Sequence, residues 1–126
     1  MYERILVVED DETMRNLILG QLKGKFQALE SGDGEDAITK VLDHKPDIIV
    51  LDLLLPKLDG FGFMEKLRSF PDPAIAKTAV LVVSNLSDQE SIAKAKKYGV
   101  LEYYIKTDVS YGILTNRINR YFNNGN

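Results

Sequence analysis

Short apolar runs alternate along this chain with segments in which apolar residues recur every three or four positions. The runs have the length and composition of β-strands, and they lie at residues 4–8, 25–30, 47–51, 78–83 and 102–105. The run at 25–30 alternates apolar and polar residues, so we expect it to be less buried than the other four. The intervening and final segments predict helices at residues 12–23, 33–43, 61–70, 88–98 and 108–122.

Side chains at helical spacing indicate which face of each helix packs inward. These are Met14, Leu17, Ile18, Gln21 and Leu22 in the first helix, Ala37, Ile38, Val41 and Leu42 in the second, Phe63, Met64 and Leu67 in the third, and Ile113, Leu114, Arg117, Ile118, Tyr121 and Phe122 in the last. Strand–helix repeats with short connections predict a parallel sheet with helices on both faces. At this length we expect one domain, residues 1–126.

Composition narrows the functional classes. The chain has no cysteine, which excludes disulfides and thiolate chemistry, and its single histidine, His44, excludes a metal centre built on several histidines. A net charge of −3 argues weakly against nucleic acid as a direct partner of this domain. No apolar run approaches the roughly 20 residues of a membrane span, and a strand follows Met1 almost at once, which leaves no room for a signal peptide. We therefore expect a cytoplasmic protein that does not enter a membrane.

Four of the predicted strands end on polar residues that suit phosphoryl chemistry. Glu9 and Asp10 follow the first strand, Asp52 the third, Ser84 the fourth and Lys106 the fifth. The carboxyl ends of parallel strands meet at one edge of the sheet, where the ligand sites of open α/β sheets lie. The sequence therefore predicts a site with three carboxylates, one hydroxyl and one ammonium group.

The acidic residues after the first strand have two explanations. Asp11 and Glu12 suit the N-terminus of the following helix, where carboxylates accept hydrogen bonds from free N–H groups. Glu9 and Asp10 lie too early for this role, and carboxylates placed together at the end of a buried strand repel each other unless a cation offsets their charge. A hard divalent cation with oxygen ligands fits this arrangement, and Mg²⁺ is the first choice.

Asp52, Ser84 and Lys106 each have a structural alternative. Asp52 could simply form the turn after its strand, but it stands between apolar residues, where a carboxylate needs a partner or a role as metal ligand, nucleophile or both. Lys106 could extend to solvent, or it could pair with Asp52 or a phosphoryl oxygen. Ser84 could cap the next helix, but Ser87 and Asp88 lie closer to it, which favours a hydrogen bond from Ser84 to a bound oxyanion.

These residues, in this order and at these strand ends, resemble the receiver domain of two-component response regulators. The stretches Ile-Leu-Val-Val-Glu-Asp-Asp-Glu from Ile5, Leu-Pro-Lys-Leu-Asp-Gly from Leu55 and Tyr-Gly-Val-Leu-Glu-Tyr-Tyr-Ile-Lys from Tyr98 match three signature stretches of that family. The similarity extends from Arg4 to Phe122. It implies a flavodoxin-like (βα)5 three-layer sandwich whose five parallel strands have the order 2-1-3-4-5.

The resemblance also implies the chemistry. Asp52 would accept a phosphoryl group from a sensor histidine kinase or a phosphotransfer protein, in a reaction that needs Mg²⁺. Asp10, Asp52 and the backbone carbonyl of Leu54 would bind Mg²⁺, and Glu9 would bind it through water. Such a chain catalyses only its own phosphorylation and dephosphorylation, and it is not an enzyme that acts on a metabolite.

In this family the phosphorylated state changes a surface that reports to a downstream effector protein or domain. Lys106 and Ser84 would contact the phosphoryl group, and Tyr103 would turn inward as Ser84 moves, whereas Tyr104 faces the other side of the sheet. The surface would be formed by the predicted fourth helix, fifth strand and fifth helix. It would also present basic side chains, which more often form a solvated face than a binding site: Lys94, Lys96, Lys97, Arg117 and Arg120.

Some positions depart from the family pattern. Thr107 follows the lysine where proline is usual, and Asn85 stands where a small residue is usual. Leu54 and Leu86 flank the site and cannot orient an attacking water, which predicts slow dephosphorylation. The alternative function is a protein-binding module of this fold that is never phosphorylated. A phosphatase of the haloacid-dehalogenase type would need an acid at Leu54, and a nucleotide-binding domain would need a glycine-rich loop after Val8.

Overall fold

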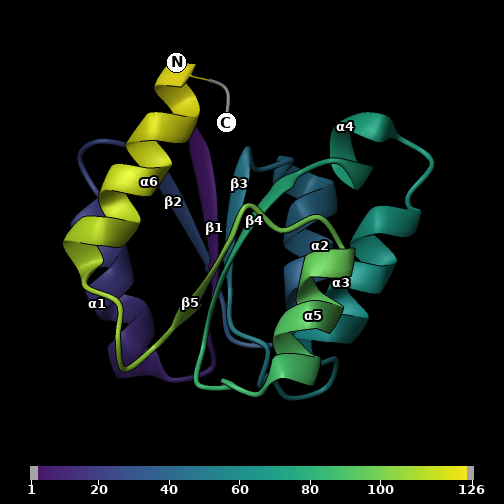
Figure 1. The fold of residues 1–126 in the computed structure, drawn as a ribbon. Helices are drawn as coiled ribbons and strands as arrows, with labels where there is room; N and C mark the ends of the chain where they lie inside the picture. The colour runs from purple at the N-terminus through teal and green to yellow at the C-terminus, as the bar shows by residue number, and fades with distance from the viewer. Residues whose placement is uncertain (1–2, 125–126) are drawn as a thin grey trace.

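A computed structural model describes residues 3–124 of the chain as a five-stranded parallel sheet with helices on both faces (Figure 1). The strand order is β2-β1-β3-β4-β5, and every neighbouring pair is parallel. This confirms the predicted fold and strand order. The strands are β1 (Arg4–Val8), β2 (Gln27–Ser31), β3 (Ile48–Leu51), β4 (Ala79–Ser84) and β5 (Glu102–Ile105).

The helices form two layers. In Figure 1, α1 and α6 cover one face of the sheet, and α2, α3 and α5 cover the other. They are α1 (Glu12–Leu22), α2 (Gly34–His44), α3 (Gly60–Ser69), α4 (Pro73–Ala76), α5 (Gln89–Lys97) and α6 (Tyr111–Asn124).

The single-turn helix α4 was not predicted from the sequence. Two prolines, Pro71 and Pro73, indicated only the end of the preceding helix. Pro73 instead occupies the first turn of α4, and the Asp72 side chain accepts a hydrogen bond from Ala74 N (2.9 Å). Proline is compatible with a first helical turn because its missing N–H would have no partner there.

Alternation along the strands divides the core into two clusters. Leu6, Ile49 and Val80 face the layer of α2, α3 and α5, whereas their chain neighbours face α1 and α6. Tyr103 and Tyr104 pack against opposite clusters, as their adjacent positions in a strand require. The central strands β1, β3 and β4 are therefore almost fully buried, and the polar residues at their carboxyl ends emerge from a rigid support.

Four side chains that helical spacing placed on inward faces are exposed: Leu17, Gln21, Leu42 and Ile113. In α1 the buried residues are Ile18, Leu19 and Leu22, so the inward face is centred one position further along than predicted. Apolar spacing predicts a face about 100° wide, and a residue at its margin can point to solvent. The predicted inward residues of α3 are all buried, which confirms that interpretation.

The last helix begins at Tyr111 and not at residue 108. Residues 106–108 form a turn, and the Ser110 hydroxyl accepts a hydrogen bond from Ile113 N (3.2 Å). A side-chain oxygen at this position satisfies one of the free N–H groups of the first turn. The helix start is therefore set by Ser110, and the turn before it carries the chain away from Lys106.

Candidate functional site

Five predicted site residues lie together at the carboxyl edge of the sheet. Glu9 and Asp10 follow β1, Asp52 follows β3, Ser84 ends β4 and Lys106 follows β5. Glu9, Asp52 and Ser84 are buried, whereas Asp10 is exposed and Lys106 is partly buried. Adjacent residues at the end of a strand point in different directions, which explains why Glu9 is enclosed while Asp10 faces solvent.

Lys106 joins two buried carboxylates. Its Nζ lies 2.9 Å from Asp52 Oδ2, one of the partners that the sequence suggested, and 2.6 Å from Glu9 Oε1. The contact with Glu9 was not predicted. β1 and β5 are not neighbours in the sheet, so this contact depends on the length of both side chains and on the twist of the sheet between the two strands.

The site is rich in negative charge. Burial raises the pKa of Glu9 to about 7, against the opposing hydrogen bonds from Lys106 and the Asp11 amide. Burial alone would lower the pKa of Lys106, but hydrogen bonds to Glu9 and Asp52 outweigh it and raise that pKa. The ammonium group of Lys106 thus pairs with two carboxylates of a cluster of three, and Asp10 forms no ion pair among the described residues.

The carboxylates fit a divalent cation. One oxygen from each of Glu9, Asp10 and Asp52 can be chosen so that all lie within 4.8 Å of one another. Two oxygens bound to the same Mg²⁺ lie at most about 4.2 Å apart, so small side-chain rotations or a water at Glu9 would close the site. The cluster can therefore hold a metal with oxygen ligands.

Backbone contacts hold Asp52 in place. Asp52 N donates to Val8 O (3.0 Å), and Asp52 Oδ1 accepts from Leu54 N (3.2 Å). Gly60, the first residue of α3, packs directly on this segment, and a Cβ at position 60 would lie 2.5 Å from Leu53 Cα. Glycine therefore allows α3 to start against the loop that positions the carboxylate.

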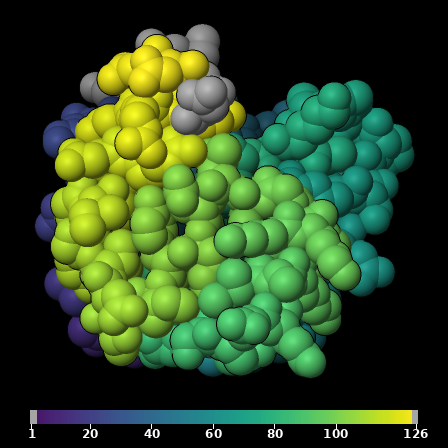
Figure 2. Space-filling view, viewed as in Figure 1, coloured from purple at the N-terminus to yellow at the C-terminus, as the bar shows by residue number. Residues whose placement is uncertain are grey.

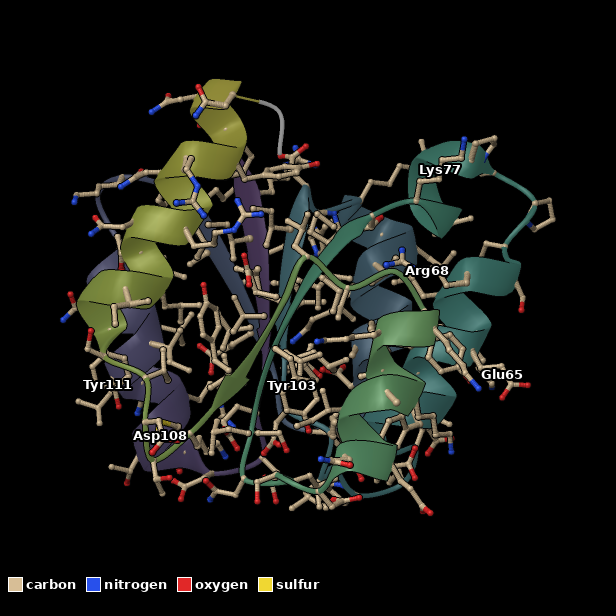
Figure 3. The ribbon with its side chains drawn as sticks, viewed as in Figure 1. Glu65, Arg68, Lys77, Tyr103, Asp108 and Tyr111 are labelled. Carbon is tan, nitrogen blue, oxygen red and sulfur yellow. The ribbon has the colours of Figure 1, made fainter. Side chains whose placement is uncertain are left out.

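Ser84 and Tyr103 hold the same residue of the loop after β4. Ser84 Oγ accepts from Leu86 N (3.3 Å), and the Tyr103 hydroxyl donates to Leu86 O (2.6 Å). Tyr103 is partly buried and lies on the α5 side of the sheet (Figure 3). The cap of α5 is the side chain of Asp88, which accepts from Ser91 N (3.0 Å), so Ser84 does not serve as that cap.

Two leucines and one asparagine flank the cluster of charged residues. Leu54 is 54% exposed and Leu86 is partly buried, while Asn85 is exposed. No peptide bond among the described residues is cis, so the bond between Lys106 and Thr107 is trans.

Arg15 is a nearby residue that sequence reasoning missed. Its guanidinium donates to the backbone carbonyl of Glu9 (2.8 Å) and pairs with Glu30 on β2 (3.0 Å). A cation four residues after Asp11, in the first turns of the helix that follows the acids, was the available signal. Arg15 fixes the backbone at the end of β1 and so positions the acidic pair.

The family model described as "Response regulator receiver domain" matches residues 5–118 of the chain. The chain therefore belongs to the response regulator receiver domain family, and receiver domains of this family interact with histidine kinases and with effector domains.

Individual relatives agree with this assignment. The chain is 33% identical over 119 residues to a protein-glutamate methylesterase/protein-glutamine glutaminase 3 of Geobacter sulfurreducens, covering 90% of this chain and 31% of that protein. It is 31% identical to a gliding motility regulatory protein of Myxococcus xanthus, covering 93% of this chain and 15% of that one. The Francisella response regulator 1452 receiver domain superposes with a TM-score of 0.85 at 25% identity, covering 98% and 99% of the two chains.

The chain spans less than a third of the length of these two curated relatives. Their remaining segments have no counterpart in this sequence, so their activities are not transferred to it. Among the described residues, no helix is long and apolar enough to cross a membrane.

Proposed function

We propose that this chain is the phosphoacceptor of a two-component pathway, in which Asp52 takes a phosphoryl group from the phosphohistidine of a sensor histidine kinase or a phosphotransfer protein. The observation that supports this most strongly is the shared contact of Lys106 with two buried carboxylates, Asp52 and Glu9, beside the exposed carboxylate of Asp10. A buried carboxylate with a fixed ammonium group and a cation-binding cluster suits phosphoryl transfer, which depends on positioning and charge.

In the transfer step, one carboxylate oxygen of Asp52 attacks phosphorus while the phosphorus–nitrogen bond to the histidine breaks. The imidazole leaves with the electron pair of that bond and takes up a proton, and Asp52 becomes an acyl phosphate. Lys106 Nζ, which now lies 2.9 Å from Asp52 Oδ2, would move to a phosphoryl oxygen as charge develops there. The buried Ser84 hydroxyl would donate to another phosphoryl oxygen.

The proposed cofactor is Mg²⁺, held by Asp10, Asp52 and the backbone carbonyl of Leu54, with Glu9 acting through water. When bound, Mg²⁺ offsets the negative charge between the carboxylates and the incoming phosphoryl group. Glu9 supports this assignment, because a nearby cation would lower the pKa of this buried carboxyl from about 7 and so favour its charged form.

The proposed output is a change in the surface formed by α5, β5 and α6. Tyr103 connects this surface to the site, because its hydroxyl is bonded to Leu86 O and Ser84 Oγ accepts from the N–H of the same residue. If Ser84 turned toward a phosphoryl oxygen, its bond to Leu86 would break and the loop would rearrange around Tyr103. An effector protein or domain would bind the altered surface, without direct contact of this domain with nucleic acid or membrane.

This function would make the chain a switch that modifies only itself, acting in the cytoplasm where kinases have ATP. Residues 1–126 would form one receiver domain. The product of each transfer is the phosphorylated protein, which is hydrolysed to restore Asp52.

Intact-mass analysis after incubation with acetyl phosphate tests the proposal. We expect one added phosphoryl group that requires Mg²⁺ and is abolished by Asp52→Asn. Asp59→Asn is the matched control, because Asp59 is a nearby exposed carboxylate that caps α3. Modification that persists in the Asp52 variant would refute the assignment. No modification, together with no Mg²⁺ binding, would favour the alternative module that binds proteins without being phosphorylated.

A further inference from the structure

The outer side of β5 is an open sheet edge. β5 pairs only with β4 within the described part of the chain, and Figure 1 shows it at the front of the molecule between α6 and α5. Lys106 N donates to Ser84 O (2.9 Å). Because alternate residues of a parallel strand bond to the same neighbour, the N–H and C=O groups of Tyr103 and Ile105 face the open side. Such an edge can pair with another extended chain.

A groove with apolar side chains along part of its lining lies on the α5 side of this edge. It has a volume of about 440 Å³, and its lining includes the apolar side chains of Ile92, Val100 and Ile105 together with Tyr103 and the exposed Lys96. In Figure 2 the surface is indented between the yellow α6 and the green α5. The groove is large enough to receive aliphatic side chains from a segment that lies along β5.

The α6 side of the edge is basic instead of apolar. Arg117 lies beside β5, because its Nε is 3.0 Å from Oε1 of Glu102 in that strand, and Arg120 follows three residues later on the same helix, α6. Arg120 is exposed and, like Lys96, forms no ion pair within residues 3–124. These cations are free to receive carboxylates from a partner.

One hydrogen-bond donor of Arg117 has no partner among the described residues. Its Nε donates to Glu102 Oε1 (3.0 Å), but its Nη1 is buried without a hydrogen-bond partner among the described residues. A buried donor without a partner is unfavourable. A carboxylate arriving beside Glu102 would allow the guanidinium to turn outward and bond with more of its donors.

We propose that the open edge of β5 binds an extended acidic segment of the effector, added to the sheet as a further strand. Side chains of an added strand alternate between the two faces of the sheet. One set would enter the groove against Ile92, Val100 and Ile105, and the other would meet Arg117 and Arg120. The segment that fits is therefore one in which apolar and acidic residues alternate. The proposal rests on the proposed function for its regulation, since Tyr103 lines the groove and also contacts the loop after Ser84.

A labelled peptide that alternates Glu and Val tests this by fluorescence anisotropy with the whole chain, measured before and after incubation with acetyl phosphate and Mg²⁺. Two control peptides alternate Lys and Val, or have the same Glu and Val residues grouped in two blocks. We expect the alternating acidic peptide to bind at least about tenfold more tightly than either control. A version with N-methyl groups at alternate residues, which cannot pair with the edge, should also lose about tenfold.

Charge reversal on the protein identifies the surface. Lys96→Glu with Arg120→Glu should weaken binding by about tenfold. Lys25→Glu with Lys77→Glu makes the same charge change at exposed residues outside β5, α5 and α6, and should alter binding by less than about twofold. Equal effects of the two pairs, or full binding of the N-methylated or grouped peptide, would overturn the proposal.

The same samples separate this inference from the proposed function. The Lys96 and Arg120 substitutions lie outside the phosphorylation site, so acetyl phosphate should modify that variant as it modifies the unaltered chain. Phosphorylation without peptide binding would refute the docking mode alone. Peptide binding by a chain that acetyl phosphate and Mg²⁺ do not modify would refute the proposed function and leave the docking surface in place.

Discussion

Replacing Lys106 with methionine tests the electrostatic account of the site. In the structure, Nζ of this residue lies within 3 Å of a carboxylate oxygen of both Glu9 and Asp52, and both carboxylates are almost fully buried. Methionine has a similar length and removes the charge. The variant therefore leaves two enclosed carboxylates that no cation offsets.

The expected destabilisation is about 3 kcal/mol at pH 8 without divalent cations, since removing one partner of a buried ion pair costs about 3–5 kcal/mol and Lys106 is not fully enclosed. Glu9 sets the pH dependence. Its folded-state pKa is already raised to about 7 and rises further without Lys106, so its stabilising contribution is lost as pH increases. At pH 5 Glu9 is protonated, and we expect the destabilisation to be smaller by about 1 kcal/mol.

Urea unfolding in the presence of a chelator measures this effect. The double variant Lys106→Met with Glu9→Gln should recover part of the loss at pH 8, because one of the unpaired carboxylates is gone. Lys23→Met, at an exposed position, is the control for removing a lysine. A loss below about 1 kcal/mol at pH 8, or no recovery in the double variant, would contradict the reasoning.

Three further predictions follow from the same structure. Glu9 has a folded-state pKa of about 7 against an ordinary value of 4.5, so in cation-free solution its contribution to the free energy of unfolding should be complete below pH 4.5 and lost as pH rises to 7. Glu9→Gln should flatten that part of the plot of urea midpoint against pH, and an unchanged slope would count against the raised pKa. Leu54→Asn with Leu86→Glu should shorten the lifetime of the phosphorylated form in a mass time course, because polar groups can orient water; an unchanged lifetime would remove the explanation. Gly60→Ala should destabilise the fold by about 2 kcal/mol or more because the added Cβ would collide with the backbone of Leu53, whereas Gly20→Ala, on an exposed helical surface with open space, should stabilise it by roughly 0.5–1 kcal/mol. Thermal unfolding of both variants measures this, and the opposite order of stabilities would contradict the reasoning.

Much of the fold is predictable because buried parallel strands are almost continuously apolar. The runs at β1 and β5 match the observed strands at both ends, and the other three differ by one or two residues. The exposed positions of Leu17 and Ile113 were not predictable from spacing alone, since both lie at the margin of an apolar face whose rotation depends on packing with neighbouring elements. The short helix α4 was not predicted because Pro71 and Pro73, which lie at its start, also commonly mark the end of a preceding helix.

The residues of the candidate site were predictable from the sequence, but their contacts with one another were not. Strand ends predict which residues reach the rim, and Glu9, Asp52 and Lys106 all lie there. Their mutual contacts depend on side-chain length and on the twist of the sheet, so the bond between Lys106 and Glu9 had no signal in the sequence. The bond from Tyr103 to Leu86 is of the same kind, because it joins a strand to a loop whose path is set by tertiary packing.

Locating the phosphoryl group on the chain tests whether Asp52 is the phosphoacceptor. Borohydride reduction of the phosphorylated protein converts an aspartyl phosphate to homoserine, and peptide mass sequencing then identifies the altered position. Asp10 is the informative competitor, because it is exposed and shares the acidic cluster with Asp52. We expect homoserine at position 52 alone and none in the Asp52→Asn variant. Homoserine at position 10, or modification at a histidine or serine, would contradict it.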